Sequence, residues 1–382
     1  MRIALVSPYD WSVPSGVNSH IGQLGQRFRQ WGHEVTILAP ASNPEEAKAD
    51  CVVMGRPRSI PVSGSLARIS FSWRGRAIEN LLTEGAFEIV HLHEPLMPLL
   101  TYQVLRHSQA TNVGTFHAAK EGGNRFYGYT RPLIQRWFRQ LDGKIAVSPS
   151  ASKLVGRYFP GYFNLIPNGI DFEHFSGDHK PLPEFDDGYF NLLFVGRPEK
   201  RKGLKYALGA FRRIHKADPR SRLIVVGGGS FERYKRIIGP EENVVFRSNV
   251  PYAELPRYHR SADVFCSPAT GNESQGIALM EAMVAKLPVV ASNIEGFAGV
   301  ITNEINGLLV PPKDDVALAE AILRLRDNPN LYEALAEQGQ AQAARYSWES
   351  VARRVLAYYE RLLQERGQVA ASQGTQREPT RA

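Results

Sequence analysis

Short runs of apolar and β-branched residues alternate with longer amphipathic stretches along the first part of the chain. Runs of this kind predict buried strands, and the stretches between most of them predict helices. A strand and a helix in repeated alternation imply right-handed parallel crossovers and a sheet covered on both faces. We therefore expect a doubly wound parallel α/β domain over residues 1–177, with strands at 2–6, 34–38, 88–91, 112–116, 144–147 and 163–166.

The same alternation restarts after a polar stretch. Residues 178–188 contain two prolines and four acidic residues with little apolar content, which is typical of an exposed linker. A second α/β domain is predicted over residues 189–346, and a helix at 347–366 is expected to return to the N-terminal domain. Residues 367–382 have almost nothing to bury, so we expect them to form a disordered tail.

The composition fits two ordinary globular domains. The 382 residues are 43% hydrophobic and 22% charged, so each domain can bury a core without cross-links. Cys51 and Cys266 give neither a disulfide framework nor a metal-binding spacing, which favours a reducing, cytoplasmic setting. Pro8 interrupts the first apolar run before a signal peptide could form. No run approaches the roughly 18 apolar residues of a membrane-spanning helix, so a soluble or peripheral protein is expected.

Positive charge is concentrated in the first half of the chain. Residues 1–170 hold 18 basic and 11 acidic side chains, and the net charge of the whole chain is +8. Two clusters interleave cations with aromatic and aliphatic side chains: Arg56, Arg58, Arg68, Arg74 and Arg76, and Lys120, Arg125, Arg131, Arg136 and Arg139. This pattern favours an anionic membrane surface on the inner face of the plasma membrane. The alternative is solvated helix faces beside core aromatics, and no nucleic-acid module is present.

The turn after the first predicted strand has the sequence SPYDWSVPSG, and a helix is predicted directly after it. Gly16 would let a ligand approach the free amides of the helix start, which attract anions such as phosphate. The alternative is a glycine kept only for the geometry of the turn. The turn lacks the GxGxxG sequence, which disfavours a nicotinamide-dependent dehydrogenase.

Two further turns carry charged residues. GRPEKRKG, after the first strand of the second domain, supplies four cations, of which Arg197 and Lys202 are our candidates for holding a diphosphate. Glu273 and Glu281 lie eight positions apart near a predicted helix start, where carboxylates can accept hydrogen bonds from sugar hydroxyls. The alternatives are a solvated charge run, an ordinary helix-start acid and a surface glutamate.

The order and spacing of these motifs resemble the GT-B glycosyltransferases of the large retaining family (glycosyl transferases group 1). The resemblance covers nearly the whole chain and implies two Rossmann-like domains facing a deep cleft. It is most specific for the phosphatidylinositol mannosyltransferases. The motifs that carry it are SPYDWSVPSGVNSH, IPVSGSLARISF, HLHEP at 91–95, GTFHA at 114–118, IPNGID at 166–171, GRPEKRKG at 196–203 and the E-x7-E pair at 273–281.

The resemblance implies metal-independent transfer of a sugar, foremost mannose from GDP-mannose, onto a membrane lipid such as phosphatidylinositol, with retention of anomeric configuration. The catalytic residues it implies are His117, Arg197, Lys202 and Glu273, with His117 close to the anomeric carbon. The donor-binding residues it implies are Gly16, Arg197, Lys202, Val250, Glu273, Gly276, Ile277 and Glu281. The acceptor-binding residues it implies are Tyr9, Asn18 and Arg68, and no cofactor or metal is expected.

Two positions depart from the inositol-lipid pattern. Asn18 and Met97 stand where those enzymes typically carry glutamine and asparagine, and a methionine sulfur is only a weak hydrogen-bond acceptor. A transferase that uses another nucleotide sugar, of the UDP-glucose type, and a different lipid or soluble acceptor therefore stays open. So do a non-catalytic binder of sugar nucleotides and anionic membranes, and an epimerase or phosphorylase on a similar frame. The oligomeric state is left open by the sequence.

Overall fold

The computed structural model describes residues 1–13, 15–47, 51–62, 65–70, 75–119, 122–236, 238 and 243–375. The chain forms two compact units. The first unit comprises Met1–Ala118, Gly122–Pro167 and the chain from Trp348 onward, and the second comprises Asn168–Ser347 together with Ala119–Glu121. The two units are described separately below.

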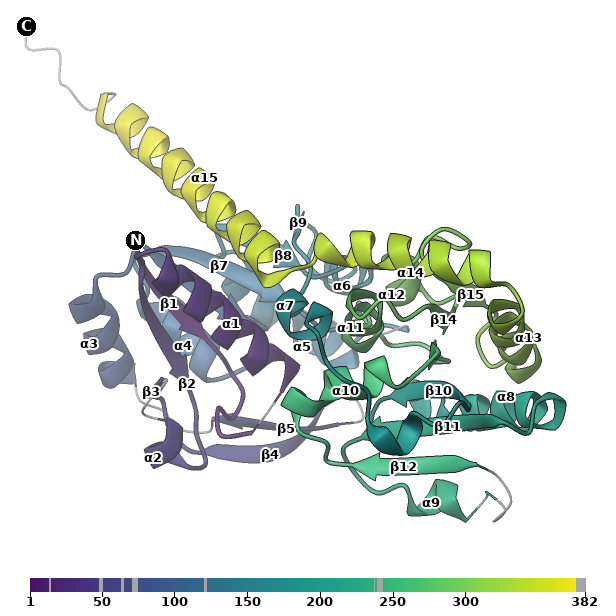
Figure 1. Ribbon diagram of the computed structural model, residues 1–382. Helices are drawn as coiled ribbons and strands as arrows, with labels where there is room; N and C mark the ends of the chain where they lie inside the picture. The colour runs from purple at the N-terminus through teal and green to yellow at the C-terminus, as the bar shows by residue number, and fades with distance from the viewer. Residues whose placement is uncertain are drawn as a thin grey trace, which may run out of the picture. The chain divides into compact units, whose positions relative to one another are not determined.

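The first unit, part of whose sheet is labelled in Figure 1, is built on a parallel sheet with the strand order β3-β2-β1-β6-β7-β8-β9. Its strands are β1 (Arg2–Val6), β2 (Glu34–Ala39), β3 (Val52–Val53), β6 (Ile89–His93), β7 (Thr111–Phe116), β8 (Gly143–Ala146) and β9 (Asn164–Leu165). The six predicted strands are all present. A separate antiparallel hairpin of β4 (Pro57–Val62) and β5 (Ser65–Ser70) was not predicted. The strand order reverses between β1 and β6, which is where ligands bind in open α/β sheets.

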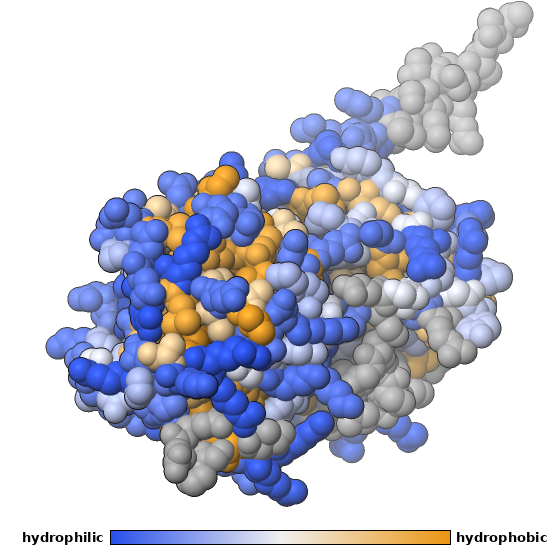
Figure 2. Space-filling view, turned by 90° about the vertical axis from the view of Figure 1, so that its right-hand side faces the viewer, coloured by the Kyte–Doolittle hydropathy of each residue, from blue (hydrophilic) through white to orange (hydrophobic). Residues whose placement is uncertain are grey.

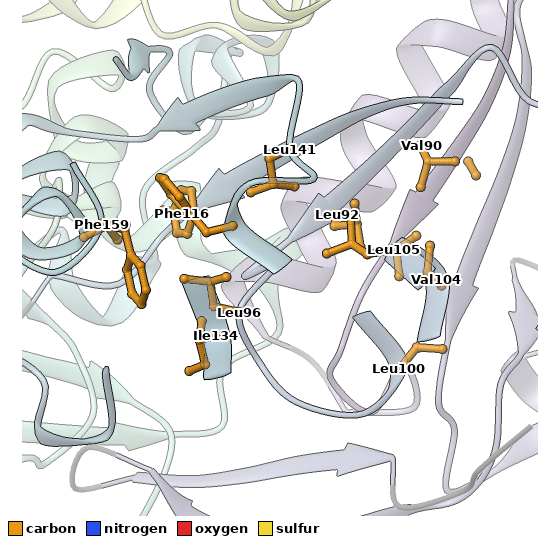
Figure 3. Close-up of a cluster of buried hydrophobic side chains, with 14 of the residues drawn as sticks. Val90, Leu92, Leu96, Leu100, Val104, Leu105, Phe116, Ile134, Leu141 and Phe159 are labelled. Carbon is orange, nitrogen blue, oxygen red and sulfur yellow. The ribbon is translucent and has the colours of Figure 1, made fainter. Parts of the chain in front are cut away.

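Successive residues of β1 face opposite sides of the sheet, as the two-residue period of a strand requires. Ile3 and Leu5 pack against α1 (Gly16–Gln30) and α15 (Trp348–Thr375). Ala4 and Val6 belong to the core on the other face, part of which is shown in Figure 3. The remaining helices of the unit are α2 (Pro44–Ala47), α3 (Gly75–Gly85), α4 (Leu100–His107), α5 (Arg125–Phe138) and α6 (Pro149–Gly156).

The C-terminal helix differs from the prediction in its length. α15 begins at Trp348 and continues to Thr375, past the predicted end at residue 366. Residues 367–375 therefore belong to the helix, and the prediction of disorder is wrong for them. The long amphipathic run that starts the helix continues with helix-forming Ala and Gln residues, so the helix propagates although little is left to bury. The rest of the predicted tail, from residue 376, lies outside the described residues.

The second unit contains a parallel sheet with the order β12-β11-β10-β13-β14-β15. Its strands are β10 (Phe190–Val195), β11 (Ser221–Gly227), β12 (Val244–Ser248), β13 (Val264–Ser267), β14 (Val289–Ser292) and β15 (Leu308–Val310). Its helices are α7 (Phe172–Ser176), α8 (Leu204–Ala217), α9 (Glu232–Lys235), α10 (Leu255–Arg260), α11 (Ile277–Val284), α12 (Glu295–Ala298), α13 (Asp315–Arg326) and α14 (Pro329–Ala344), with short 3-10 turns η1 (Pro183–Phe185), η2 (Lys200–Lys202) and η3 (Tyr252–Glu254). Both units are thus Rossmann-like, which confirms the predicted fold class.

The predicted linker is a packed part of the second unit. Phe185 is 4% exposed in the same core as Phe175, and its carbonyl accepts a hydrogen bond of 2.9 Å from Asn191 Nδ2. The boundary between the two units falls between Pro167 and Asn168. The polar composition of residues 178–188 predicted an exposed linker, but Phe185, the single aromatic residue of this stretch, packs in the core.

The surface of the described residues offers little apolar area in the second unit. Large hydrophobic side chains that are exposed there are scattered over several elements: Tyr252, Ile277, Ile305 and Val316. On the face shown in Figure 2, hydrophobic patches are interrupted by hydrophilic residues. No helix among the described residues combines the length and the apolar character that crossing a membrane requires.

Candidate functional site

The strand order of the second unit reverses between β10 and β13, so the loops that follow these two neighbouring strands lie side by side. The backbones of the loops are in close contact. The amide of Thr270 donates a 2.8 Å hydrogen bond to the carbonyl of Arg201, and a Cβ atom at Gly203 would lie 1.8 Å from the carbonyl oxygen of Pro268. The positive φ of Gly203, +75°, adds a second reason for glycine at this position.

This contact brings two cations to one carboxylate. Lys202 Nζ lies 2.7 Å and an Arg201 guanidinium nitrogen 2.6 Å from Glu273 Oε1. Because the Glu273 side chain is only 10% exposed, water screens its attraction to these two cations weakly. Lys202 and Glu273 are predicted site residues, whereas Arg201 was counted only as one of four neighbouring cations. The spacing of the run does not show which cation reaches the carboxylate, so sequence reasoning had no signal for it.

Arg197 takes a different place from the one that a shared site with Glu273 would suggest. Its guanidinium lies 3.0 Å from Glu199, and Glu199 also binds Arg201 at 2.7 Å. Arg197 is therefore joined to Glu273 through a chain of alternating charges rather than directly. The Arg197 side chain is 60% exposed, so an anionic ligand could draw it from Glu199 at small energetic cost.

Glu281 differs from Glu273 in its surroundings. It lies on α11, whose start is set by Gly276 at φ +76°, and it is 8% exposed. Burial raises the pKa of Glu281 to about 7, so this carboxyl exists in both protonation states near neutral pH. The alternative of an ordinary surface glutamate is wrong. Ile277 lies at the exposed start of the same helix, and Val250, in the loop after β12, packs on the core that α11 also joins.

In the first unit the helix start at Gly16 borders a cavity of about 590 Å³, which is lined by Trp11, Ser12, Val13, Ser15, Gly16, Asn18 and Ser19. Gly16 is exposed, and a Cβ atom there would meet nothing within 4 Å. Its φ is not positive, and it is the first residue of the helix α1, so its backbone conformation is open to other residues. The turn itself thus does not require glycine, which weakens the alternative that Gly16 serves turn geometry alone.

Asn18 is turned into the protein. Its Oδ1 accepts a 2.7 Å hydrogen bond from the hydroxyl of Ser7, and its Nδ2 donates to the carbonyls of Asp10 and Val13 at 2.8 and 3.3 Å. Both amide hydrogens of Asn18 therefore hold the turn after β1. Burial and the charge of Glu94 raise the pKa of Tyr9. Arg68 lies on β5, and its side chain is outside the described residues.

His117 follows β7 and is part of a group of histidines. Its Nε2 lies 3.0 Å from His93 Nδ1, at the end of the neighbouring strand β6. Ligand nitrogens of His20, His93 and His117 lie within 4.8 Å of one another, which makes these three the group among the described residues that could hold a metal ion. The sequence does not state which strands are neighbours, so nothing in it indicates that His20 and His93 lie beside His117.

The fold and these loop motifs define a glycosyltransferase of the two-domain, Rossmann-like GT-B type. The model of Glycosyltransferase Family 4 matches residues 14–174, and that of Glycosyl transferases group 1 matches residues 178–342. The phosphatidyl-myo-inositol mannosyltransferase of Mycobacterium leprae is 36% identical over 370 residues, covering 94% of this chain and 96% of the relative. The protein of that name from Mycobacterium tuberculosis strain H37Rv is 36% identical over 375 residues, with 94% and 97% covered. The chain therefore belongs to the glycosyltransferase family that these matches define, with a Glycosyltransferase Family 4 region followed by a Glycosyl transferases group 1 region.

Solved structures agree with the fold. Sucrose-phosphate synthase from Thermosynechococcus elongatus aligns with a TM-score of 0.73 at 22% identity, covering 95% of this chain and 99% of that one. The Anabaena protein HepE in complex with UDP-glucose aligns with a TM-score of 0.72 at 16% identity, with 94% and 99% covered.

Proposed function

We propose that this glycosyltransferase moves mannose from GDP-mannose to the inositol headgroup of phosphatidylinositol, with retention of anomeric configuration and without a metal ion. The observation that carries the proposal is the 36% identity, over 94% of the chain, with relatives named phosphatidyl-myo-inositol mannosyltransferases. The motifs SPYDWSVPSGVNSH and IPVSGSLARISF, in the half that would bind the acceptor, support it. The complex of HepE with UDP-glucose supports a nucleotide sugar as the donor.

The charged residues of the second unit suit a nucleotide diphosphate sugar. Lys202 and the exposed Arg197 would bind the diphosphate, and Glu273 would accept hydrogen bonds from the sugar hydroxyls. Arg201 would keep Glu273 in place when Lys202 moves from Glu273 to the phosphate. Glu281 would bind the ribose, and the raised pKa of this carboxyl lets it donate as well as accept a hydrogen bond near neutral pH. Val250, Gly276 and Ile277 would complete the donor site, with Gly16 leaving room for the phosphate.

Departure of the diphosphate leaves negative charge that must be stabilised. The guanidinium of Arg197 and the ammonium of Lys202 would supply positive charge for this purpose without an ion. His117 would position the sugar beside the bond that breaks. The mechanism predicts that the transfer rate is unchanged in EDTA. It also predicts an α-linked product from an α-linked donor, and NMR of the purified glycolipid would measure the anomeric configuration.

The lipid acceptor requires contact with a membrane surface. On α5, Phe126, Tyr129 and Leu133 are 43%, 79% and 66% exposed. Their spacing of three and four residues places them on one face of the helix. Arg131 and Arg136 of α5 and Arg139 directly after it are exposed, and so are Arg56, Arg58 and Arg76 of the other cluster. Tyr127 and Phe138 are buried and belong to the core, so only part of the predicted aromatic set could face lipid. Lys120 and Arg74 lie outside the described residues.

The test is incubation with GDP-mannose, GDP-glucose, UDP-glucose or UDP-galactose and with vesicles of defined lipid, followed by mass detection of glycosylated lipid. We expect hexose on phosphatidylinositol with GDP-mannose. Donor hydrolysis without any glycosylated lipid in every arm would overturn the proposal. Donor binding without turnover would instead favour the non-catalytic binder.

A different acceptor is the second candidate, and the environment of Asn18 favours it. The amide hydrogens of Asn18 are used within the protein, and Met97 is 9% exposed with no amide to offer an inositol ring. A relative from Acholeplasma laidlawii, 23% identical with 92% of this chain and 95% of that protein covered, is named alpha-monoglucosyldiacylglycerol synthase. Diacylglycerol and monoglucosyldiacylglycerol vesicles therefore belong in the panel, and a product in those arms alone would select this candidate.

A further inference from the structure

We infer that two residues that are neighbours in the chain position His117: His93 holds its ring, and Glu94 holds its backbone. His93 also fixes the neutral tautomer of His117 in which the proton is on Nδ1. The consequence for catalysis rests on the proposed glycosyl transfer. The tautomer of His117 and its backbone contacts do not depend on that proposal, because they are properties of the protein without substrate.

The pairing of two neighbouring strands creates the arrangement. His93 is the last residue of β6 and pairs in register with Thr115 of β7. The amide of Glu94 continues the ladder by donating a 2.8 Å hydrogen bond to the carbonyl of Thr115. Glu94 then takes a φ of +48°, which is uncommon for a residue with a side chain and turns the chain out of the strand. His117 follows β7 directly, so it meets the His93–Glu94 pair.

Glu94 holds the backbone at His117. One oxygen of its carboxylate, Oε1, accepts hydrogen bonds from the amides of both His117 and Ala118, each at 2.8 Å. Glu94 is 4% exposed; burial raises the pKa of its carboxyl, and the hydrogen bonds from the two amides act in the opposite direction. In a trans peptide the N–H and C=O groups point in opposite directions. The bond to the Ala118 amide therefore directs the carbonyl of His117 away from Glu94.

His93 holds the ring. Its Nδ1 lies 3.0 Å from His117 Nε2, and the two rings are stacked with centroids 5.3 Å apart. The other nitrogen, His93 Nε2, is buried and has no hydrogen-bond partner among the described residues. An unpaired buried N–H is rarer than an unpaired acceptor, so the proton of His93 belongs on Nδ1. His93 then donates to His117 Nε2, and the proton of neutral His117 must sit on Nδ1.

Neighbouring side chains hold the His93 ring in place. The His91 ring lies 4.3 Å from it, held by hydrogen bonds to Tyr359 and Thr115 of 2.5 and 2.6 Å. His20 meets both His93 and His117 edge-on, with centroids 5.2 and 4.9 Å away. In the proposed reaction, His117 would thus act with its ring held by His93 and its backbone held by Glu94.

The tautomer is measured by long-range ¹H–¹⁵N correlation spectra of histidine side chains in the full chain, at pH 7.5 with EDTA. The His117 signals are assigned by their loss in His117→Gln. We expect one tautomer, with a protonated Nδ1 and an unprotonated Nε2, and a mixture of tautomers in His93→Phe, which keeps a ring without the hydrogen bond. His33→Gln, remote in sequence and near the chain's amino terminus, is the control. An Nε2-protonated His117, or an unchanged tautomer in His93→Phe, overturns the inference.

The backbone contact is tested by hydrogen exchange at the amides of His117 and Ala118. Glu94→Ala should raise both exchange rates at least tenfold, and Glu94→Gln, which keeps one acceptor oxygen, should raise them less. If Glu94→Ala does not fold, Glu94→Gln alone decides, because unchanged exchange in that variant contradicts the inference. In the transferase assay Glu94→Gln should lower kcat more than it changes KM for the donor. A chain that shows the expected spectra but forms no product overturns the proposed function and leaves this inference intact.

Discussion

At the scale of single residues, the structure separates side chains of similar type by what each one touches. Glu273 is held by two cations, whereas Glu281, eight positions along, is buried and has a raised pKa. Lys202 reaches Glu273, whereas Arg197 pairs with Glu199. Two residues of the same charge in one motif therefore have different partners in the protein without ligand.

Lys202→Ala should lower kcat/KM for sugar transfer by roughly 10²-fold or more, because a positive charge that would bind the leaving diphosphate is lost. Steady-state kinetics with the accepted donor measure this. Lys205→Ala is the matched control, since Lys205 lies on the exposed face of α8 three residues further on and stacks on Tyr206. Equal losses in the two variants would mean that general positive charge, and not the position of Lys202, matters.

Gly16→Ala should leave the free energy of unfolding unchanged or slightly higher, because its Cβ meets no protein atom and alanine favours the helix. The affinity for the nucleotide sugar should fall about tenfold or more, since the methyl group occupies the space of the phosphate. Calorimetric titration and urea denaturation measure the two effects. Gly22→Ala, on the same helix and equally free of contacts, should change stability alone. Unchanged donor affinity in Gly16→Ala would place the phosphate elsewhere.

At the scale of elements, α11 shows how packing sets the chemistry of a side chain. Its buried residues fill the space against β13, β14 and α14, and Glu281 is carried into this environment with them. A sequence pattern that is apolar nearly all round the helix is typical of a buried helix. That pattern was the available signal that Glu281 is not a surface residue.

The burial of Glu281 makes stability depend on pH. Because its pKa is about 7 when folded and 4.5 in the reference state, the native chain keeps a proton that the unfolded chain releases between these pH values. Stability should therefore fall as pH rises from about 4.5 to 7, by on the order of 2–3 kcal/mol. Urea denaturation should show that Glu281→Gln removes this slope, whereas Glu320→Gln, at an exposed site on α13, retains it. The same slope in all three proteins would contradict the assignment.

At the scale of the whole molecule, the surplus of positive charge lies in the part of the chain that would bind the acceptor. The exposed side chains of α5 add apolar contacts to that charge. Each Lys or Arg near an anionic surface contributes about 1 kcal/mol, and salt screens the contribution.

The chain should sediment with vesicles that contain anionic lipid and be released at high salt. Binding should weaken severalfold in a Tyr129→Ser, Leu133→Ser double variant. Tyr162→Ser is the control, since Tyr162 is 76% exposed but lies outside α5. Equal binding to neutral vesicles would remove the electrostatic explanation, and an unaffected double variant would remove α5 from the contact.

The sequence by itself determined the class of fold, because the alternation of apolar runs and amphipathic helices is a local pattern that each segment carries. It also placed Lys202 and Glu273 in turns that follow strands. Only the tertiary structure decided that Arg201 binds Glu273 together with Lys202 and that Asn18 donates hydrogen bonds within the turn after β1. It also decided that the rings of His93 and His117 are in contact. Those facts depend on which strands are neighbours and on which side chains lose water, and neither is a property of a single segment.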